Sequence, residues 1–179
     1  RRRHTRLQGD WSSDVCSSDL EMLYPTLALY LFATEQPTAQ QAAFRLYNDW
    51  ICDYRQVAPQ RLFGIGCLAV FDIQAAVAEL ERCRALGLDG VMVWQSPHPT
   101  LPFHSTHYTP LWEAAAATRM PISFHALTGF KESPAIPGLP PWDPLMRRSV
   151  AGKLNSVVDL LYTLIFHGIR SEEHTSELQ

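Results

Sequence analysis

The sequence of 179 residues has little charge, few cysteines and no long apolar run. Charged residues make up 18% of the chain and the formal net charge is −3, so nothing indicates a nucleic-acid partner. No stretch approaches the ~20 uncharged apolar residues of a membrane span, so no membrane partner is expected. The four cysteines form no C-x-x-C pair, which favours a reducing, cytoplasmic compartment over a disulfide scaffold.

Several motifs of well-known sites are also missing. The sequence has no G-x-G-x-x-G, P-loop, G-x-S-x-G or H-E-x-x-H pattern. The hydrophobic residues, in contrast, amount to 46%, which argues against wholesale disorder. The length suits one domain with a buried core.

Both ends of the sequence are expected to be foreign to the protein. Residues 10–20 read DWSSDVCSSDL, and residues 170–179 read RSEEHTSELQ. One DNA string encodes the first segment and its reverse complement encodes the second, a relation that unrelated termini have no reason to show. The string resembles a short-read sequencing adapter, whose outer arm fits RRRHTR at residues 1–6. We therefore expect adapter read-through at 1–20 and 170–179 and genuine protein at 21–169, with polar disordered tails as the alternative.

Between these ends, strand and helix signals alternate. Met22–Tyr24 is a short apolar run that Pro25 ends, as at the tail of a strand. Continuous apolar runs predict buried strands at 61–71, 90–94 and 121–127. Helical spacing of apolar residues predicts helices at 38–57, between Asp72 and Gly87, at 110–119 and from Pro144 onward. This order implies right-handed crossovers and a parallel sheet.

Apolar residues recur at helical spacing in two of these helices, and the first is therefore expected to be amphipathic. In helix 38–57 the stripe comprises Ala43, Leu46, Tyr47, Trp50, Ile51, Tyr54 and Val57. In the last helix it comprises Leu154, Val157, Val158, Leu161 and Ile165. Asp72 is expected to cap the helix that follows it, and Gly87 to end that helix. Three cysteines on apolar faces are assigned to the core, namely Cys52, Cys67 and Cys83.

Sites in parallel α/β folds lie at the carboxyl ends of the strands. The best candidate there is His125, which follows a predicted strand and precedes a long loop. Its imidazole can bind a divalent metal or transfer a proton. Spacing alone leaves open a histidine that is merely hydrogen-bonded at a strand end. His98, His104 and His107 are interpreted as part of an ordered loop, and His167 as a capping or core residue.

Six short runs occur in the order found in one family. They are Leu23–Thr26, Tyr47–Trp50, Arg61–Gly64, Ala75–Cys83, Leu86–Val91 and Ser123–His125. Together they resemble the amidohydrolase-related enzymes, in the branch that contains aminocarboxymuconate-semialdehyde decarboxylase. The resemblance implies an α/β fold, a partial (β/α)₈ TIM barrel that covers about strands two to five with their helices.

The resemblance also implies a chemistry. His125 matches the fifth-strand histidine that binds the catalytic divalent metal, with zinc as the expected ion. Trp94 and Tyr24 would line the substrate pocket, together with Phe103, Gln95 and Thr128. The parent protein would be a metal-dependent hydrolase or carboxy-lyase (decarboxylase) whose partner is a small carboxylic acid or related compound. Homo-oligomer formation stays open.

The family's other metal ligands do not occur in residues 21–169. An H-x-H pair would precede Met22, and a late histidine and aspartate would follow Ile169. Because one imidazole cannot hold zinc against water, we expect the chain as written to be an inactive fragment. With two open sheet edges it is also expected to aggregate. Two alternatives are a non-enzymatic half-barrel binding domain and a metal-free barrel lyase that uses His125 as acid or base.

Overall fold

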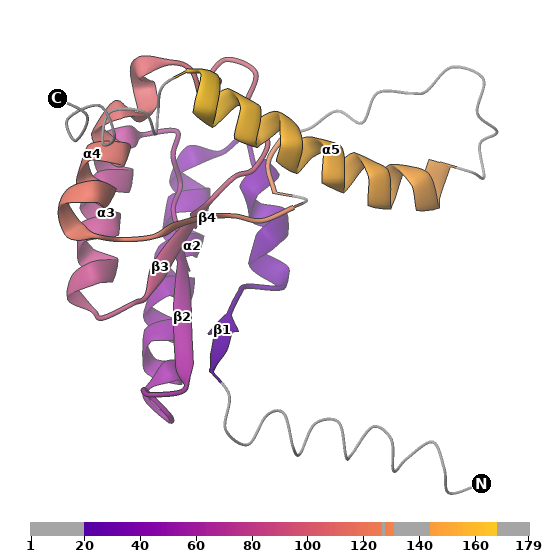
Figure 1. Ribbon diagram of the computed structural model, residues 1–179. Coiled ribbons are helices and arrows are strands. Elements are labelled where there is room, and N and C mark those ends of the chain that lie inside the picture. Colours follow the sequence, from indigo (N-terminus) through magenta and orange to yellow (C-terminus); the bar gives the residue numbers. More distant parts are fainter. Residues whose placement is uncertain (1–19, 127, 131–143, 168–179) are drawn as a thin grey trace, which may run out of the picture.

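The computed structural model describes residues 20–126, 128–130 and 144–167, with the side chains of the last range from residue 155 onward. Strands and helices alternate along these residues (Figure 1). The strands are β1 (Glu21–Leu23), β2 (Leu62–Cys67), β3 (Gly90–Val93) and β4 (Ile122–Phe124). The α-helices are α2 (Pro37–Arg55), α3 (Ile73–Ala85), α4 (Thr109–Thr118) and α5 (Pro144–Phe166). Two 3-10 helices are η1 (Leu27–Ala33) and η2 (Thr106–Tyr108).

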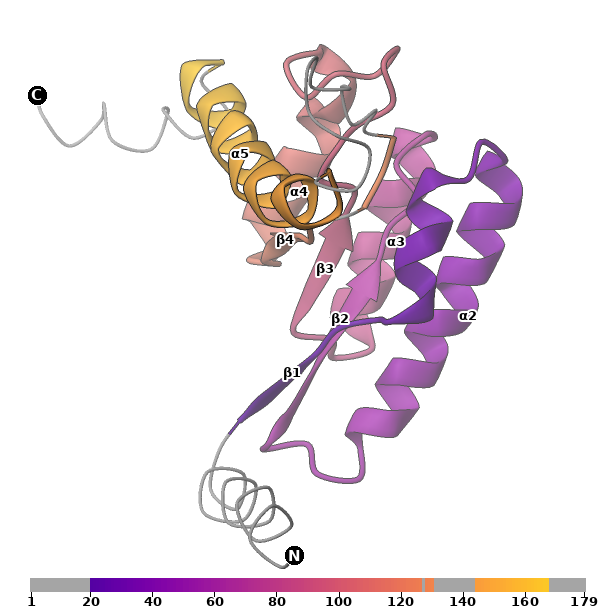
Figure 2. The same cartoon turned by 90° about the vertical axis from the view of Figure 1, so that its right-hand side faces the viewer.

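The four strands form one parallel sheet in the order β1-β2-β3-β4. Met22 pairs with Phe63, Ile65 with Gly90, and Met92 with Ser123. In Figure 2 the helices α2, α3 and α4 follow one another in chain order on the outside of the sheet. This arrangement confirms the predicted parallel α/β fold, which is half of a (β/α)₈ barrel.

Two glycines of β2 show which face of the sheet the helices cover. A Cβ atom at Gly64 would lie 2.9 Å from a Leu88 methyl, and one at Gly66 would lie 3.1 Å from the Asn48 side-chain oxygen. Both glycines therefore point toward the helices and permit their close approach. Because side chains alternate along a strand, Ile65 and the neighbours paired with it point to the opposite, concave face.

Helix α3 begins and ends as predicted. The Asp72 carboxylate accepts hydrogen bonds from the backbone N–H groups of Gln74 and Ala75, both at 3.1 Å. Gly87 follows the helix with φ +84°, a conformation that glycine adopts without strain. Cys52, Cys67 and Cys83 are buried free thiols, which confirms their assignment to the core.

The apolar stripes that the spacing picks out in α2 and α5 are not the faces that these helices bury. Only Ile51 of the α2 stripe is fully buried, and the helix buries Gln40, Phe44, Asn48, Ile51 and Cys52. Helix α5 buries Ser156, Leu160 and Leu164, whereas four residues of its apolar stripe are exposed, namely Val157, Val158, Leu161 and Ile165. The burial of Leu154 lies outside the described side chains. Both helices are apolar on more than one face, so periodicity alone did not identify the face that packs.

Two strands are shorter than predicted. Strand β2 ends at Cys67, and the buried residues Leu68–Val70 continue outside the ladder. One further bond, from Leu68 N–H to the Met92 carbonyl at 2.9 Å, joins this segment to β3. Strand β4 ends at Phe124, so His125 lies one residue beyond it. An apolar run predicts burial and not the point where two strands separate.

A polar cluster joins α2, β2 and α3. The buried Asn48 amide donates to the Cys67 carbonyl at 3.0 Å and to Glu79 at 2.8 Å, and its oxygen accepts from Cys67 N–H at 2.7 Å. Arg82 bridges Glu79 and Asp49 with contacts of 2.6 Å. Burial by itself raises the pKa of the Glu79 carboxyl, but hydrogen bonds from Arg82 and Asn48 and the charges of Arg82 and Arg45 outweigh it. The pKa therefore lies below its ordinary value.

Candidate active site at the carboxyl ends of the strands

The concave face of the sheet brings Tyr24, Ser123 and His125 together. Ser123 pairs with Met92, which places both on the face that points away from the helices. His125, two residues later, continues on that face. Tyr24 follows β1 at the other end of the sheet, and its hydroxyl lies 3.1 Å from the Ser123 hydroxyl. The Tyr24 and His125 rings are 5.8 Å apart between centroids.

The hydrogen bond of His125 determines which nitrogen is available. Its Nδ1 lies 2.7 Å from the Ala126 carbonyl oxygen, which can only accept a hydrogen bond. Nδ1 therefore carries the proton, and the neutral ring has its lone pair on Nε2. The side chain is half-buried. A backbone carbonyl that holds one ring nitrogen in this way is a common support for a metal-binding histidine.

Thr128 joins the ends of β3 and β4 behind His125. Its hydroxyl donates to the His125 carbonyl at 2.7 Å and accepts from Gln95 N–H at 2.8 Å. Gly129 follows with φ +97° and forms a bridge with Ser96, where a Cβ atom would lie 1.9 Å from the Ser96 oxygen. No side chain fits at that position, so the chain after β4 folds back tightly onto the end of β3.

Gln95 carries a buried polar group without a partner. The side chain is 5% exposed, and its Nε2 has no hydrogen bond. Its backbone N–H is the donor to Thr128, so the residue lies at the carboxyl end of β3 close to the predicted site. An unpaired buried amide costs stability, and such groups occur where a ligand or water completes the bonding.

Trp94 and Phe103 lie in an aromatic layer around Tyr108. Trp94 is fully buried, and its indole N–H donates to the Tyr108 hydroxyl at 3.1 Å. Its ring makes edge contacts with Phe71 and Phe130. Phe103 is also buried and packs on Tyr108, Trp112 and Phe124.

Sequence reasoning did not single out Ser123, Tyr108 and Phe130 as neighbours of the predicted residues. Ser123 could have been found from strand alternation, because it lies two residues before His125 in the same predicted strand. Tyr108 and Phe130 lie in segments with no regular spacing, and only the fold places them against Trp94.

The other histidines have separate roles. His98 and His107 bind Thr100 and the Val70 carbonyl respectively, as expected of an ordered loop. His104 stacks on His167 with 4.9 Å between ring centroids. His167 is exposed and its Nδ1 donates to the Thr163 carbonyl, which fits the predicted capping role and not a core role. In the described residues no group of three or more His, Cys, Asp or Glu side chains could hold a metal ion.

The amidohydrolase family model matches residues 14–173. The chain belongs to the amidohydrolase family. The match covers all four strands and α5, and it extends into both terminal segments that are expected to be translated adapter. No curated protein matches the chain.

Solved structures with the same fold include amidohydrolases and decarboxylases. A Staphylococcus aureus protein assigned as an amidohydrolase has a TM-score of 0.73 at 20% identity, over 92% of this chain and 54% of its own. The 2,6-dihydroxybenzoate decarboxylase from Rhizobium has a TM-score of 0.67 at 19% identity, over 94% of this chain and 52% of its own. A dihydroxybenzoic acid decarboxylase from Polaromonas, with bound manganese and 2-nitroresorcinol, has a TM-score of 0.60 at 20% identity. The match covers 94% of this chain and 52% of that protein.

This amidohydrolase-family chain spans about half the length of the structures that it matches. These likenesses show the half-barrel fold. Among the helices that the structure describes, none is long and apolar enough to cross a membrane.

Proposed function

We propose that the chain carries one side of the active site of a metal-dependent amidohydrolase-family enzyme. The reaction would be decarboxylation or hydrolysis of a small carboxylic acid or related compound. The supporting observation is His125, because its Nδ1–H bond to the Ala126 carbonyl leaves the Nε2 lone pair free as a metal ligand. The family match and the decarboxylase neighbours support the choice of reactions.

The proposed ion is zinc, and manganese is the competing ion because two neighbouring decarboxylases have it bound. Imidazole nitrogen suits both ions. When bound, such a metal polarises a substrate oxygen or activates water. In the described residues only His125 is proposed as a ligand, so the remaining ligands would come from outside them.

Tyr24 and Gln95 are the proposed substrate contacts with the strongest support. Tyr24 is 39% exposed beside His125, and its phenol can bind a substrate oxygen if it leaves Ser123. The Gln95 amide has an unpaired Nε2 that suits a carboxylate. Trp94, Phe103 and Thr128 would support the pocket from behind, since each is buried in this structure. The buried free thiols fit a reducing compartment, and we propose a cytoplasmic enzyme.

The segments 1–20 and 170–179 are proposed to be translated adapter, with the enzyme's half-barrel at 21–169. The test is to sequence the source DNA outward from codons 21 and 169. A genomic reading frame that encodes DWSSDVCSSDL and RSEEHTSELQ would overturn the adapter proposal.

The function is tested on the complete protein recovered from that DNA. We expect release of carbon dioxide from 2,6-dihydroxybenzoate, or hydrolysis of an amide or ester analogue, that a chelator abolishes and zinc or manganese restores. H125A should reduce kcat/KM by at least about 100-fold, whereas H98A in the ordered loop should change it little. Full turnover with chelator present, lost in H125A, would favour the metal-free lyase. Turnover that H125A leaves intact would overturn the proposal for this residue.

A further inference from the structure

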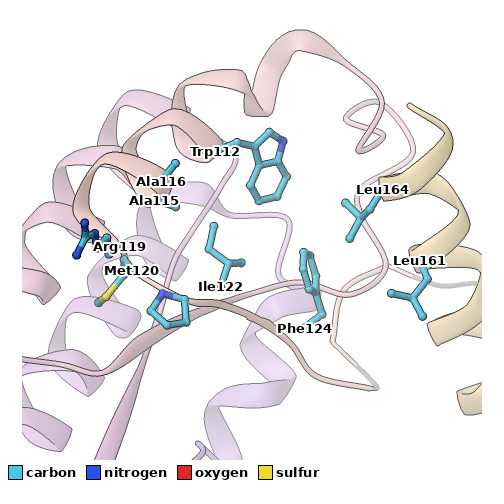
Figure 3. Close-up of a pocket in the computed structure, with 10 residues that line it drawn as sticks. Trp112, Ala115, Ala116, Arg119, Met120, Ile122, Phe124, Leu161 and Leu164 are labelled. Atoms are coloured by element: carbon cyan, nitrogen blue, oxygen red, sulfur yellow. The ribbon is translucent and has the colours of Figure 1, made fainter. Parts of the chain in front are cut away.

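Strand β4 contributes one polar side chain to the concave face of the sheet. Ser123 lies between Ile122 and Phe124, whose side chains line the groove of ≈ 650 Å³ between α4, α5 and β4 (Figure 3). Because side chains alternate along a strand, Ser123 points to the opposite side. It pairs there with Met92, which in turn pairs with Cys67, and both of these residues are buried. A serine hydroxyl among such apolar neighbours needs a polar partner.

That partner is Tyr24, which follows the strand at the other end of the sheet. The two hydroxyl oxygens are 3.1 Å apart, although β1 and β4 are the first and last of the four strands. In a flat sheet, three spacings of about 4.8 Å would separate these strands by roughly 14 Å, so the contact depends on the curvature of the sheet. Tyr24 is 39% exposed, so packing restrains its ring less than that of a core tyrosine. The hydrogen bond to Ser123 therefore has a large share in fixing the phenol.

The position of this phenol matters because His125 lies beside it. The Tyr24 and His125 rings are 5.8 Å apart between centroids and inclined by 50°. Ser123 is two residues before His125, so both side chains belong to the same face of the sheet. A phenol that Ser123 holds therefore stays next to the imidazole that is the proposed metal ligand.

Two hydroxyl groups that share one hydrogen bond keep one proton unused. Either oxygen can be the donor in the contact between Tyr24 and Ser123. When the phenol donates, it must leave Ser123 before it can donate to a substrate. When Ser123 donates, the phenol keeps its place and its own proton is available. Since each bond in a chain of hydrogen bonds polarises the next, a phenol that accepts from serine is also the better donor.

We propose that Ser123 is a positioning residue of the proposed active site. It donates to the Tyr24 phenol and so directs the phenolic proton to an oxygen of the substrate. That oxygen would be an acceptor such as a carboxylate or a carbonyl, since the phenol supplies the proton. The inference deepens the proposed function and rests on it, because Tyr24 is a substrate contact there. Ser123 itself acts only through Tyr24.

The first test is the spectrum of the phenol itself, with no metal and no substrate present. The complete protein recovered from the source DNA is labelled with [ζ-¹³C]tyrosine, and the Tyr24 signal is the one that Tyr24→Phe removes. At constant pH, Ser123→Ala should shift this signal because the hydroxyl that bonds the phenol is gone. Ser123→Thr, which keeps a hydroxyl, should leave the signal close to its original position.

Ser105→Ala is the matched control for this spectrum. The Ser105 oxygen is buried and has no hydrogen-bond partner among the described residues, so its removal deletes the same atom without breaking a bond. The Tyr24 signal should not move in this variant. An unchanged Tyr24 signal in Ser123→Ala would overturn the contact, and the positioning role with it.

The second test is the steady-state kinetics of the metal-loaded complete protein with 2,6-dihydroxybenzoate, or with the amide or ester analogue that it hydrolyses. Tyr24→Phe should raise KM by about 10-fold and change kcat by less than about two-fold, as expected for one lost hydrogen bond to the substrate. Ser123→Ala should raise KM by about 3- to 10-fold, and Ser123→Thr by less. In the Tyr24→Phe background, Ser123→Ala should have no further effect because the serine acts through the phenol. Two effects that multiply would show independent action and overturn the positioning role.

Failure of this inference is distinguishable from failure of the proposed function. A complete protein without turnover, or with turnover that H125A leaves intact, would contradict the proposed function and the substrate part of this inference together. Turnover that requires His125, with a KM that Ser123→Ala leaves unchanged, would contradict this inference alone.

Discussion

At the scale of single residues, a histidine's role depends on the groups that surround it. His125 and His98 have the same side chain and both follow the carboxyl end of a strand. His125 donates from Nδ1 to a carbonyl, whereas the Nδ1 of His98 accepts from the Thr100 N–H at 3.3 Å. Sequence spacing does not distinguish these two environments, and the folded backbone does.

The two histidines are therefore expected to be opposite tautomers. In the neutral form of each ring, His125 should carry its proton on Nδ1 and His98 on Nε2. Long-range ¹H–¹⁵N correlation spectra of the labelled chain distinguish the tautomers by the ring nitrogen shifts. An Nε2–H form of His125 would contradict the metal-ligand assignment, and His98 is the internal control.

Two glycines with positive φ should differ in their tolerance of a methyl group. Gly129→Ala combines an unfavourable φ with a contact of 1.9 Å to the Ser96 oxygen and should lower the free energy of unfolding by about 2–4 kcal/mol. Gly87→Ala adds only the conformational penalty, about 1 kcal/mol, since its nearest neighbour is the end of Arg55 at 3.3 Å. Urea unfolding of both variants measures the difference, and equal losses would contradict the tight turn beside Ser96.

At the scale of elements, buried polar groups determine how α2, β2 and α3 fit together. Asn48 substitutes for a strand neighbour by bonding both backbone groups of Cys67, and it also bonds Glu79. A helix that places Asn48 toward the sheet must turn Leu46 and Trp50 outward. The buried face of α2 thus follows from hydrogen bonding as much as from hydrophobicity.

Removing the Asn48 amide should weaken this junction strongly. Asn48→Leu keeps the volume but leaves Cys67 N–H and the Glu79 carboxylate without that partner, so we expect a loss of about 2–4 kcal/mol in urea unfolding. Gln41→Leu, an exposed amide on the same helix, is the matched control and should change stability by less than about 0.5 kcal/mol. A loss of unfolding free energy for Asn48→Leu that is as small as the loss for Gln41→Leu would show that the network contributes little.

The lowered pKa of Glu79 predicts acid sensitivity. The ionised carboxylate is favoured in the folded state, so its contribution is full above the unfolded value of about 4.3 and is lost as pH falls through the lower folded pKa. We expect stability to decline as pH falls below about 4.3. Glu79→Gln should flatten this part of the profile, which urea unfolding over that range measures. An unchanged profile would assign the acid response to other carboxylates.

At the scale of the whole molecule, the described residues form half a barrel. They carry one side of the proposed site. The concave face gathers Tyr24, Ser123 and His125, but no set of three metal-ligating side chains occurs in the described residues. A catalytic zinc site takes three protein ligands. Under the proposed function, the remaining ligands would therefore come from residues outside the described ones.

The purified chain should show no metal-dependent turnover by itself. With zinc or manganese added, it should release no carbon dioxide from 2,6-dihydroxybenzoate above the level of the H125A variant, because a single imidazole cannot retain the ion in a reactive position. A headspace carbon dioxide assay is the measurement. Turnover that depends on both metal and His125 would show that the chain supplies a complete centre.

The sequence by itself determined the order of strands and helices, the parallel sheet, the Asp72 cap and the glycine that ends α3. These features follow from local patterns, because buried strands need continuous apolar runs and helix ends need particular residues. The six family-like runs also led to the amidohydrolase family, which the match over residues 14–173 confirms. His125 was singled out for its place after a strand, and its ligand role stays a proposal.

Only the tertiary structure decided which helix faces are buried and how the site residues lie. The outward turn of Trp50 and Leu161, the burial of Trp94 and Phe103, and the Tyr24–Ser123 contact depend on residues far apart in the sequence. Helical periodicity identifies apolar faces but not their partners, and strand order does not specify curvature. Those properties arise when packing and hydrogen bonding are satisfied together, which no local pattern encodes.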